Sequence, residues 1–275
     1  MNFKQNKLVA VAIAFAIALA FHLLIFLLAM VLPEGGLAQR VAEVMGASFP
    51  GGIIQFATTV LFTYAMLMSY SESQRITIEQ SASELNLLPE REQLVLDAED
   101  VAKIKLEAIE LDRQQPSLLF DLVKKACTQF RANKSVGEMM EVVQSQSRIN
   151  RQVTSSDVDA LYHVNAVLPS IGFIGTIIGI ASALGLAYLV VPDAPMSSDM
   201  LGAIDAAGTQ MGQAQQGIAA VTQQLYVAFD TTLWALLLNL VLSFRLSGIS
   251  TSMEKLHGHL ESYVLENLVN RVYHD

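Results

Sequence analysis

The chain has 275 residues, of which 52% are hydrophobic and 16% are charged, and its formal net charge is -9. Soluble globular proteins carry about 25% charged residues, so this composition is typical of a protein embedded in a membrane. The negative net charge argues against nucleic acid as a binding partner.

Four segments of about 20 residues or more are almost entirely apolar, which is the length that an α-helix needs to cross a bilayer. They comprise residues 8–32, 51–70, 166–191 and 225–244. These runs contain two ionisable residues, His22 in the first and Asp230 in the fourth. We therefore predict an all-α integral membrane protein with four transmembrane helices, surrounded by membrane lipid.

The basic residues are distributed unevenly around the four spans. Sixteen Lys and Arg residues precede the first span, separate the second from the third or follow the fourth, whereas Arg40 is alone in the loops 33–50 and 192–217. Positively charged residues are retained on the cytoplasmic side of a membrane. We therefore predict that both termini and residues 71–164 are cytoplasmic and that the two loops lie outside.

Residues 71–164 show apolar side chains at three- and four-residue steps, which indicates a series of helices rather than an independent globular domain. The predicted helices comprise residues 71–88, 90–114, 116–131 and 135–151. The last of these helices, residues 135–151, begins at a capping box of Ser135 and Glu138. Ser155, Ser156 and Asp157 then offer an N-cap for a helix that passes into the third span. Mixed charges here are typical of a solvated face, with docking of another protein as the alternative.

After the fourth span, an apolar stripe over residues 246–268 predicts an amphipathic helix that packs on a neighbouring helix. The chain is thus expected to comprise a first transmembrane pair (1–70), a cytoplasmic helical insertion (71–164), a second transmembrane pair (165–247) and a cytoplasmic C-terminal helix (248–275).

The two ionisable residues inside spans are candidates for function, because a charge in hydrocarbon is costly. Asp230 either serves as an intramembrane acid or ties the fourth span to another helix through a hydrogen bond, with Tyr226, Tyr64 or Thr59 as the expected partner. For His22 we expect an interhelical hydrogen bond, with a proton relay as the alternative.

No His, Cys or Ser constellation, phosphate loop or metal-spaced cluster is present in the sequence, so we predict neither an enzyme nor a bound metal or cofactor. Cys127 is the single cysteine, which excludes a disulfide within one chain. We expect it to be a packed thiol in a reducing compartment.

The third span carries small residues at helical spacing, Gly172, Gly175 and Gly179, with one hydroxyl, Thr176, among them. Small residues in a membrane helix indicate that another backbone approaches closely. That backbone is either the fourth span of the same subunit or the helix of a partner protein.

Residues 168–179, LPSIGFIGTIIG, resemble the Pro, Gly, Gly-Thr, Gly signature of the MotA/TolQ/ExbB ion-channel family. Residues 228–235, AFDTTLWA, are similar to the Ala-Leu-x-[Ala/Thr]-Thr segment of that family. Four spans with a long insertion resemble the flagellar-stator-like members. No stretch of the insertion, however, matches the charged segment by which stators engage a rotor.

The resemblance implies a channel-forming stator subunit in the bacterial inner membrane. It would form a homopentamer around a dimer of a MotB/TolR/ExbD-like single-span protein, whose membrane Asp carries the transported proton or sodium ion. The ion-motive force would then drive mechanical work or transport across the cell envelope. The alternative is an inert four-span scaffold without ion flux.

The resemblance also implies roles for particular residues. Thr176 and Thr232 match the family's two hydroxyl positions in the ion path, and Thr231 is a third candidate. The alternative for these threonines is a hydrogen bond to the backbone of their own helix, four residues earlier. Pro169 matches the family's proline, either as a hinge or as a local helix adjustment.

Overall fold

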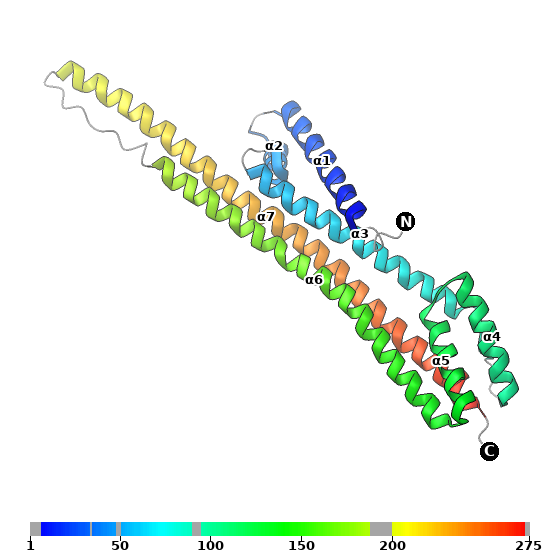
Figure 1. Ribbon diagram of the computed structural model, residues 1–275. Coiled ribbons are helices and arrows are strands. Elements are labelled where there is room, and N and C mark those ends of the chain that lie inside the picture. The colour runs from blue at the N-terminus through cyan, green and yellow to red at the C-terminus, as the bar shows by residue number, and fades with distance from the viewer. Residues whose placement is uncertain (1–6, 34, 48–50, 90–94, 188–199, 273–275) are drawn as a thin grey trace. The chain divides into compact units, whose positions relative to one another are not determined.

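The computed structural model describes residues 7–33, 35–47, 51–89, 95–187 and 200–272. In this part of the chain the secondary structure is helical, with one parallel bridge between Leu96 and Val272. The longer helices are α1 (Lys7–Val31), α3 (Gly51–Ser83), α4 (Ala98–Gln114), α5 (Leu118–Asn133), α6 (Val136–Ala187) and α7 (Met200–Asn267) (Figure 1). The short helices are α2 (Leu37–Ala42), the π-helix η1 (Glu43–Ala47) and the 3-10 helix η3 (Val269–Arg271).

Four of these helices, α1, α3, α6 and α7, are long and apolar enough to cross a membrane. The prediction of an all-α chain with four membrane-spanning helices is confirmed at this level. The expected end of the third span, residues 188–191, lies outside the described residues.

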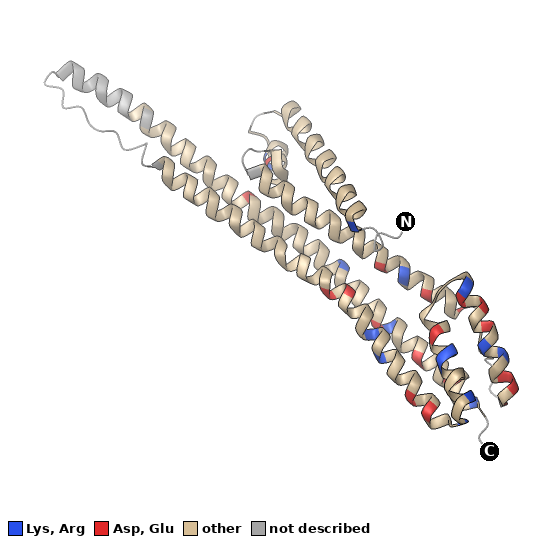
Figure 2. Cartoon of the chain, viewed as in Figure 1, with Lys and Arg blue, Asp and Glu red and all other residues tan. Residues whose placement is uncertain are grey.

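The chain divides into two compact units that share α3, α6 and α7. The apolar unit comprises Met1–Leu67 and His163–Ser243, and the charged unit comprises Met68–Tyr162 and Phe244–Asp275. Figure 2 shows Lys, Arg, Asp and Glu along α4 and α5 of the charged unit, whereas α1 of the apolar unit is almost entirely tan.

In the apolar unit, α1 buries a narrow face of mostly small side chains, Ala10, Ala14, Ala18 and Ile25. The four-residue step places the three alanines on one side of the helix. Aromatic contacts accompany this face. The rings of Phe15 and Phe56 meet edge to face at 5.2 Å between centroids, and those of Phe21 and Trp234 stack at 6.1 Å.

The charged unit has an apolar core to which α4, α5, α6 and α7 all contribute. Its largest fully buried side chains include Leu88, Leu96, Leu119, Phe120, Met139, Leu260 and Leu268. The stripe predicted after the fourth span is part of this core, because Leu246, Ile249, Met253, Leu256, Leu260, Val264 and Leu268 are all buried. The insertion and the end of α7 therefore stabilise one another in a single unit.

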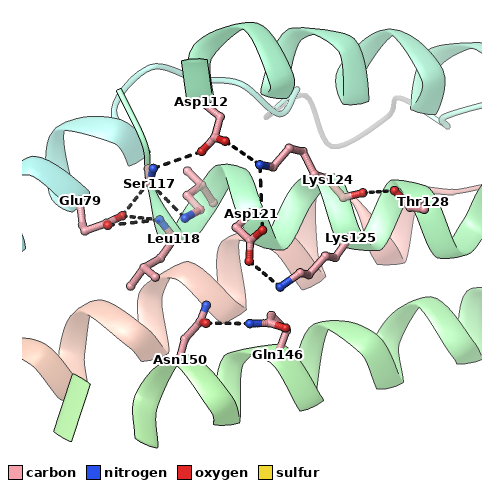
Figure 3. Close-up of polar contacts among 11 residues, drawn as sticks. Glu79, Asp112, Ser117, Leu118, Asp121, Lys124, Lys125, Thr128, Gln146 and Asn150 are labelled. Carbon is pink, nitrogen blue, oxygen red and sulfur yellow. Dashed lines mark hydrogen bonds and ion pairs between the residues drawn. The ribbon is translucent and has the colours of Figure 1, made fainter. Parts of the chain in front are cut away.

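Polar side chains fix where the helices of the charged unit begin. Asp97 caps α4 by accepting hydrogen bonds of 2.8 Å from the backbone N–H groups of Glu99 and Asp100. Ser117 caps α5, and the side chain of Glu79 in α3 accepts a second bond there, 2.9 Å from Leu118 N (Figure 3).

Several predicted boundaries in the insertion are wrong. The helix that follows the second span ends at Ser83, not residue 88, and Leu88 turns into the core and donates its N–H to the Tyr263 hydroxyl at 3.2 Å. Helix α4 begins at Ala98 rather than residue 90, because Leu96 instead donates its N–H to Arg271 O at 2.8 Å.

The predicted N-cap at residues 155–157 is also wrong, since α6 runs through it without interruption. Ser155 and Ser156 donate their hydroxyls to the carbonyls of Gln152 and Val153, three residues earlier, so they do not cap a new helix. Similarly, α7 already begins at Met200, so residues 200–217 of the predicted loop 192–217 are helical.

The capping box predicted at Ser135 forms only in part. The backbone N–H of Glu138 donates to Ser135 Oγ at 3.3 Å. The Glu138 carboxylate instead accepts hydrogen bonds from Gln129 and Asn133 of α5, which holds its pKa below the usual range. The side chain thus links two helices rather than closing the box.

Candidate functional site

In the apolar unit, Thr176 and Thr232 meet where α6 packs against α7. Their hydroxyls form a hydrogen bond to each other, and each also reaches a carbonyl of the opposite helix. Thr176 Oγ1 lies 3.2 Å from Ala228 O, and Thr232 Oγ1 lies 3.1 Å from Gly172 O. The structure therefore brings the two predicted residues, Thr176 and Thr232, into direct contact, and we call them the threonine pair.

Each hydroxyl of the threonine pair has more acceptors within reach than hydrogens to donate, because a hydroxyl carries one hydrogen. The bonds to their own helices are present as well, from Thr176 to Gly172 O at 3.3 Å and from Thr232 to Ala228 O at 3.4 Å. The two hydroxyl hydrogens can therefore change acceptors by rotation about the Cβ–Oγ1 bond, and neither backbone needs to move.

The three glycines lie against α7 of the same chain, which is the first of the two alternatives for their face. A Cβ on Gly172 would lie 2.8 Å from Ala235 Cβ, and one on Gly179 would lie 2.6 Å from Ala228 Cβ. Real Cβ atoms do not approach so closely, so the helix contact requires glycine at these positions. In this chain the glycines allow the threonine hydroxyls to reach the opposite backbone.

Thr231 is fully buried and packs on Gly175, where a Cβ would lie 2.7 Å from Thr231 Cβ. Its hydroxyl donates to Ala228 O of its own helix at 2.9 Å. Thr231 therefore belongs to the same helix contact, but its hydroxyl hydrogen is directed at its own backbone.

Pro169 lies inside α6 and does not interrupt it. Proline has no N–H, so the carbonyl four residues earlier, Asn165 O, loses its intrahelical donor. The side chain of Asn239 in α7 supplies a replacement, with Nδ2 2.9 Å from Asn165 O. The released carbonyl is thus satisfied across the contact between α6 and α7.

The partner of Asp230 is Arg40, and the predicted partners are wrong. Arg40 Nη2 lies 2.6 Å from Asp230 Oδ1, and its Nη1 lies 3.0 Å from Glu43 Oε2. The guanidinium also covers the Tyr226 ring at 4.6 Å from its centroid. Thr59 is engaged elsewhere, since its hydroxyl accepts a 3.0 Å bond from Trp234 Nε1.

This ion pair stands beside two pockets that share Arg40 and Glu43. One has a volume of about 400 Å³ and is also lined by Thr222, Gln223, Tyr226 and Asp230. The other, of about 550 Å³, is also lined by Gly35, Gly36, Leu37 and Gln39. The Asp230 side chain is 5% exposed, whereas those of Arg40 and Glu43 are 38% and 36% exposed. The pair therefore joins a buried carboxylate to an accessible surface.

The interhelical hydrogen bond predicted for His22 is wrong. Its Nδ1 lies 3.0 Å from Ala18 O of the same helix, and its buried Nε2 has no hydrogen-bond partner among the described residues. The ring packs on Gly46, whose φ of +112° and close approach, 2.8 Å from a would-be Cβ to His22 Nε2, both require glycine. The contacts of the His22 ring with Gly46 and Phe56 are therefore steric and aromatic rather than polar.

Cys127 is buried in the core of the charged unit, and burial raises the pKa of its thiol to about 12. Within the described ranges, no group of three or more His, Cys, Asp and Glu is placed to hold a metal ion.

Sequence reasoning missed two sets of residues at this site, and each had a signal. Arg40 is the single basic residue on the predicted outer side, so it was the only cation there that a buried carboxylate could find. Asn165 stands four residues before Pro169, where a carbonyl must lose its donor, and the apolar fourth span contains a second amide, Asn239.

Comparison of the chain with protein-family models, curated proteins and solved structures finds no match. The resemblance to the MotA/TolQ/ExbB family therefore rests on residues 168–179 and 228–235.

Proposed function

We propose that this chain is a channel-forming subunit that conducts protons or sodium ions across the bacterial inner membrane. A single-span partner with one membrane Asp would carry the ion along the subunit, and the ion-motive force would drive mechanical work or transport across the envelope. The observation that carries the proposal is the threonine pair, in which two hydroxyls meet between two helices that are long and apolar enough to cross a membrane.

The chemistry of the threonine pair suits a cation or a proton-carrying group. An ion, or a carboxylate that carries one, is costly to place in hydrocarbon unless polar atoms replace its water. Four oxygen atoms gather here, the two hydroxyls and the carbonyls of Gly172 and Ala228. Since the hydroxyl hydrogens can rotate away, the lone pairs of the hydroxyl oxygens can face a passing ion, and the hydrogens can then return to the backbone carbonyls.

The proposed assembly is a pentamer of this chain around a dimer of the partner, with both termini in the cytoplasm. Its support is the family resemblance, the distribution of basic residues and the surface of α6 away from α7. Phe173, Ile177 and Leu184 are each more than half exposed on the isolated chain. Such side chains suit contact with lipid or with other subunits.

A second function, a four-span scaffold without ion flux, is favoured by one specific observation. Both hydroxyls of the threonine pair already have partners within the chain, so the pair also suffices as a device that fastens α6 to α7. Ion flux separates the two functions.

The test is flux through the complex as the cell assembles it. The chain would be purified from its native membranes with its bound proteins, identified by mass spectrometry, and reconstituted in liposomes that report internal pH and sodium. We expect a single-span protein with a membrane Asp to copurify. We expect Thr232→Val, which keeps the shape and removes the hydroxyl, to lose most of the flux.

Thr63→Val in α3 is the matched control, because among the described residues the Thr63 hydroxyl bonds only to Thr59 O of its own helix. Its flux should equal that of the unchanged protein. If the unchanged complex conducts neither ion, or if Thr232→Val conducts normally, the channel function is wrong and the scaffold is preferred.

A further inference from the structure

A second polar cluster joins α6 to α7 in the apolar unit, and the proposed function does not account for it. Asn165 Nδ2 donates to Ser243 Oγ at 2.7 Å, while Asn239 donates to Asn165 O at 2.9 Å. Asn165 is 7% exposed. We call these three residues the asparagine cluster.

The asparagine cluster lies on the same helix faces as the threonine pair. On α6, Asn165 and Thr176 are 11 residues apart, which is about three full turns and brings them within about 20° of each other. On α7, Asn239 and Ser243 follow Thr232 by seven and 11 residues, which again corresponds to about 20°. The polar atoms thus form one stripe along the contact between α6 and α7, with the asparagine cluster nearer the charged unit.

One atom of the cluster has no partner. Asn165 Oδ1 is buried and makes no hydrogen bond within the described residues. Exchanging the amide nitrogen and oxygen does not remove the deficit, because Ser243 Oγ can then donate to the oxygen while the nitrogen is left without an acceptor. A buried polar atom without a partner is destabilising, so its presence in an apolar contact needs an explanation.

Pro169 lies four residues after Asn165 and makes α6 easier to bend at this point. Because the bond from residue 169 to Asn165 O is missing, α6 can bend here without losing an intrahelical hydrogen bond. Asn239 holds the released carbonyl in this structure, and Asn165 keeps its free amide atom closed off. A small bend of α6 would open that atom to a water molecule.

We propose that Asn165, Asn239 and Ser243 form a second polar station of the ion path, at which a water molecule binds the free Asn165 amide atom. This inference rests on the proposed function. The water hydrates a transported sodium ion, or accepts a transported proton. This step comes before or after the ion passes the threonine pair. Asn165 is then the binding residue, Ser243 is a positioning residue that orients its amide, and Asn239 is a positioning residue that holds its backbone carbonyl.

The competing explanation is a structural clamp, in which the cluster only fastens α6 to α7. A clamp needs the donor bond from Asn165 to Ser243 but no access from water. The two explanations therefore differ in whether aqueous ions reach residue 165.

Accessibility is tested first, and it does not depend on a measured flux. Asn165→Cys and Leu168→Cys are made in a Cys127→Ala background and treated with Ag⁺ in the assembled complex. Leu168 is fully buried one turn away and carries no polar group, so it is the matched control. We expect Ag⁺ to modify position 165 and to spare position 168. Equal modification at both positions, or none at position 165, overturns the inference.

Flux is tested second, in the liposomes described above. We expect Asn165→Leu to lose most of the flux, and Asn165→Asp to retain flux that becomes pH-dependent as the new carboxyl titrates. If Asn165→Leu does not assemble, Asn165→Asp alone carries the test. A residue that only clamps the helices does not meet the ion, so its replacement by Asp should not make the flux depend on pH. Normal flux in Asn165→Leu with loss in Thr232→Val overturns the inference and leaves the proposed function standing. No flux in the unchanged complex overturns both.

Discussion

Both units of this protein bury a carboxylate where helices meet, but they stabilise it in different ways. In the apolar unit, Asp230 pairs with the cation Arg40 at 2.6 Å. In the charged unit, Glu79 accepts hydrogen bonds from two neutral donors, the Ser117 hydroxyl at 2.6 Å and Leu118 N at 2.9 Å. No ion pair of Glu79 occurs among the residues that the structure describes.

The difference follows from what each surrounding offers. Helix α5 begins beside Glu79, and the N-terminus of a helix presents unpaired N–H groups and a partial positive charge (Figure 3). Asp230 lies inside a helix, whose own N–H groups are already bonded, so it needs a partner from another segment. A buried acid can thus be held by a helix end in one unit and requires a basic side chain in the other.

The two units also pack their helices differently. The charged unit fills its core with Leu, Phe, Val and Met side chains. In the contact between α6 and α7 of the apolar unit, three glycines bring the backbones together and polar groups bridge them. Lipid is as apolar as leucine, so close approach and hydrogen bonds replace the hydrophobic effect as the source of specificity there.

The largest expected effect comes from removing the cation of the apolar unit. Arg40→Leu leaves the buried Asp230 carboxylate without its partner and should lower the free energy of unfolding by about 3 kcal/mol. The measurement is unfolding in mixed micelles with increasing SDS, followed by circular dichroism. Arg40→Leu combined with Asp230→Leu should recover part of this loss. A double variant as unstable as the single one would show that charge pairing is not the cause.

A smaller effect is expected from a methyl group in the glycine contact. Gly175→Ala places a Cβ 2.7 Å from Thr231 Cβ and should cost about 1–3 kcal/mol in the same measurement, because it forces the helices apart. Gly185→Ala is the matched control, since nothing lies within 4 Å of its would-be Cβ. It should be neutral or gain up to about 1 kcal/mol from helix propensity. Equal losses at both sites would contradict the close contact.

The smallest effect is expected at Glu79, and it depends on pH. Burial raises the pKa of Glu79, against the hydrogen bonds from Ser117 and Leu118, which lower it. The folded protein therefore binds this proton more tightly than the unfolded chain, and its stability should rise as the pH falls from neutral through that raised pKa.

Glu79→Gln keeps an acceptor oxygen, so it should change the stability at neutral pH by less than about 1 kcal/mol. It should remove the part of the pH dependence that Glu79 causes, measured as the difference between the melting temperatures of the two proteins across the acidic range. Identical pH profiles for the two proteins would show that Glu79 does not titrate in this range.

Local patterns predicted the helices well and their ends less well. The four apolar spans were found because length and hydropathy are properties of one segment. The predicted cap at Ser155 and Ser156 was wrong because these hydroxyls can bond their own helix equally well, and nothing in the segment chooses between the two. The start of α4 was missed because Leu96 pairs with the chain near Arg271, 175 residues later in sequence.

The sequence by itself determined which segments are apolar, where glycines and threonines recur and which residues must find polar partners. Only the tertiary structure decided the partners, as the pairing of Arg40 with Asp230, 190 residues apart, and of Asn239 with the Asn165 carbonyl illustrates. The physical reason is that hydropathy and helix periodicity act within a segment. Pairing depends on the register of one helix against another, and many distant contacts set that register together.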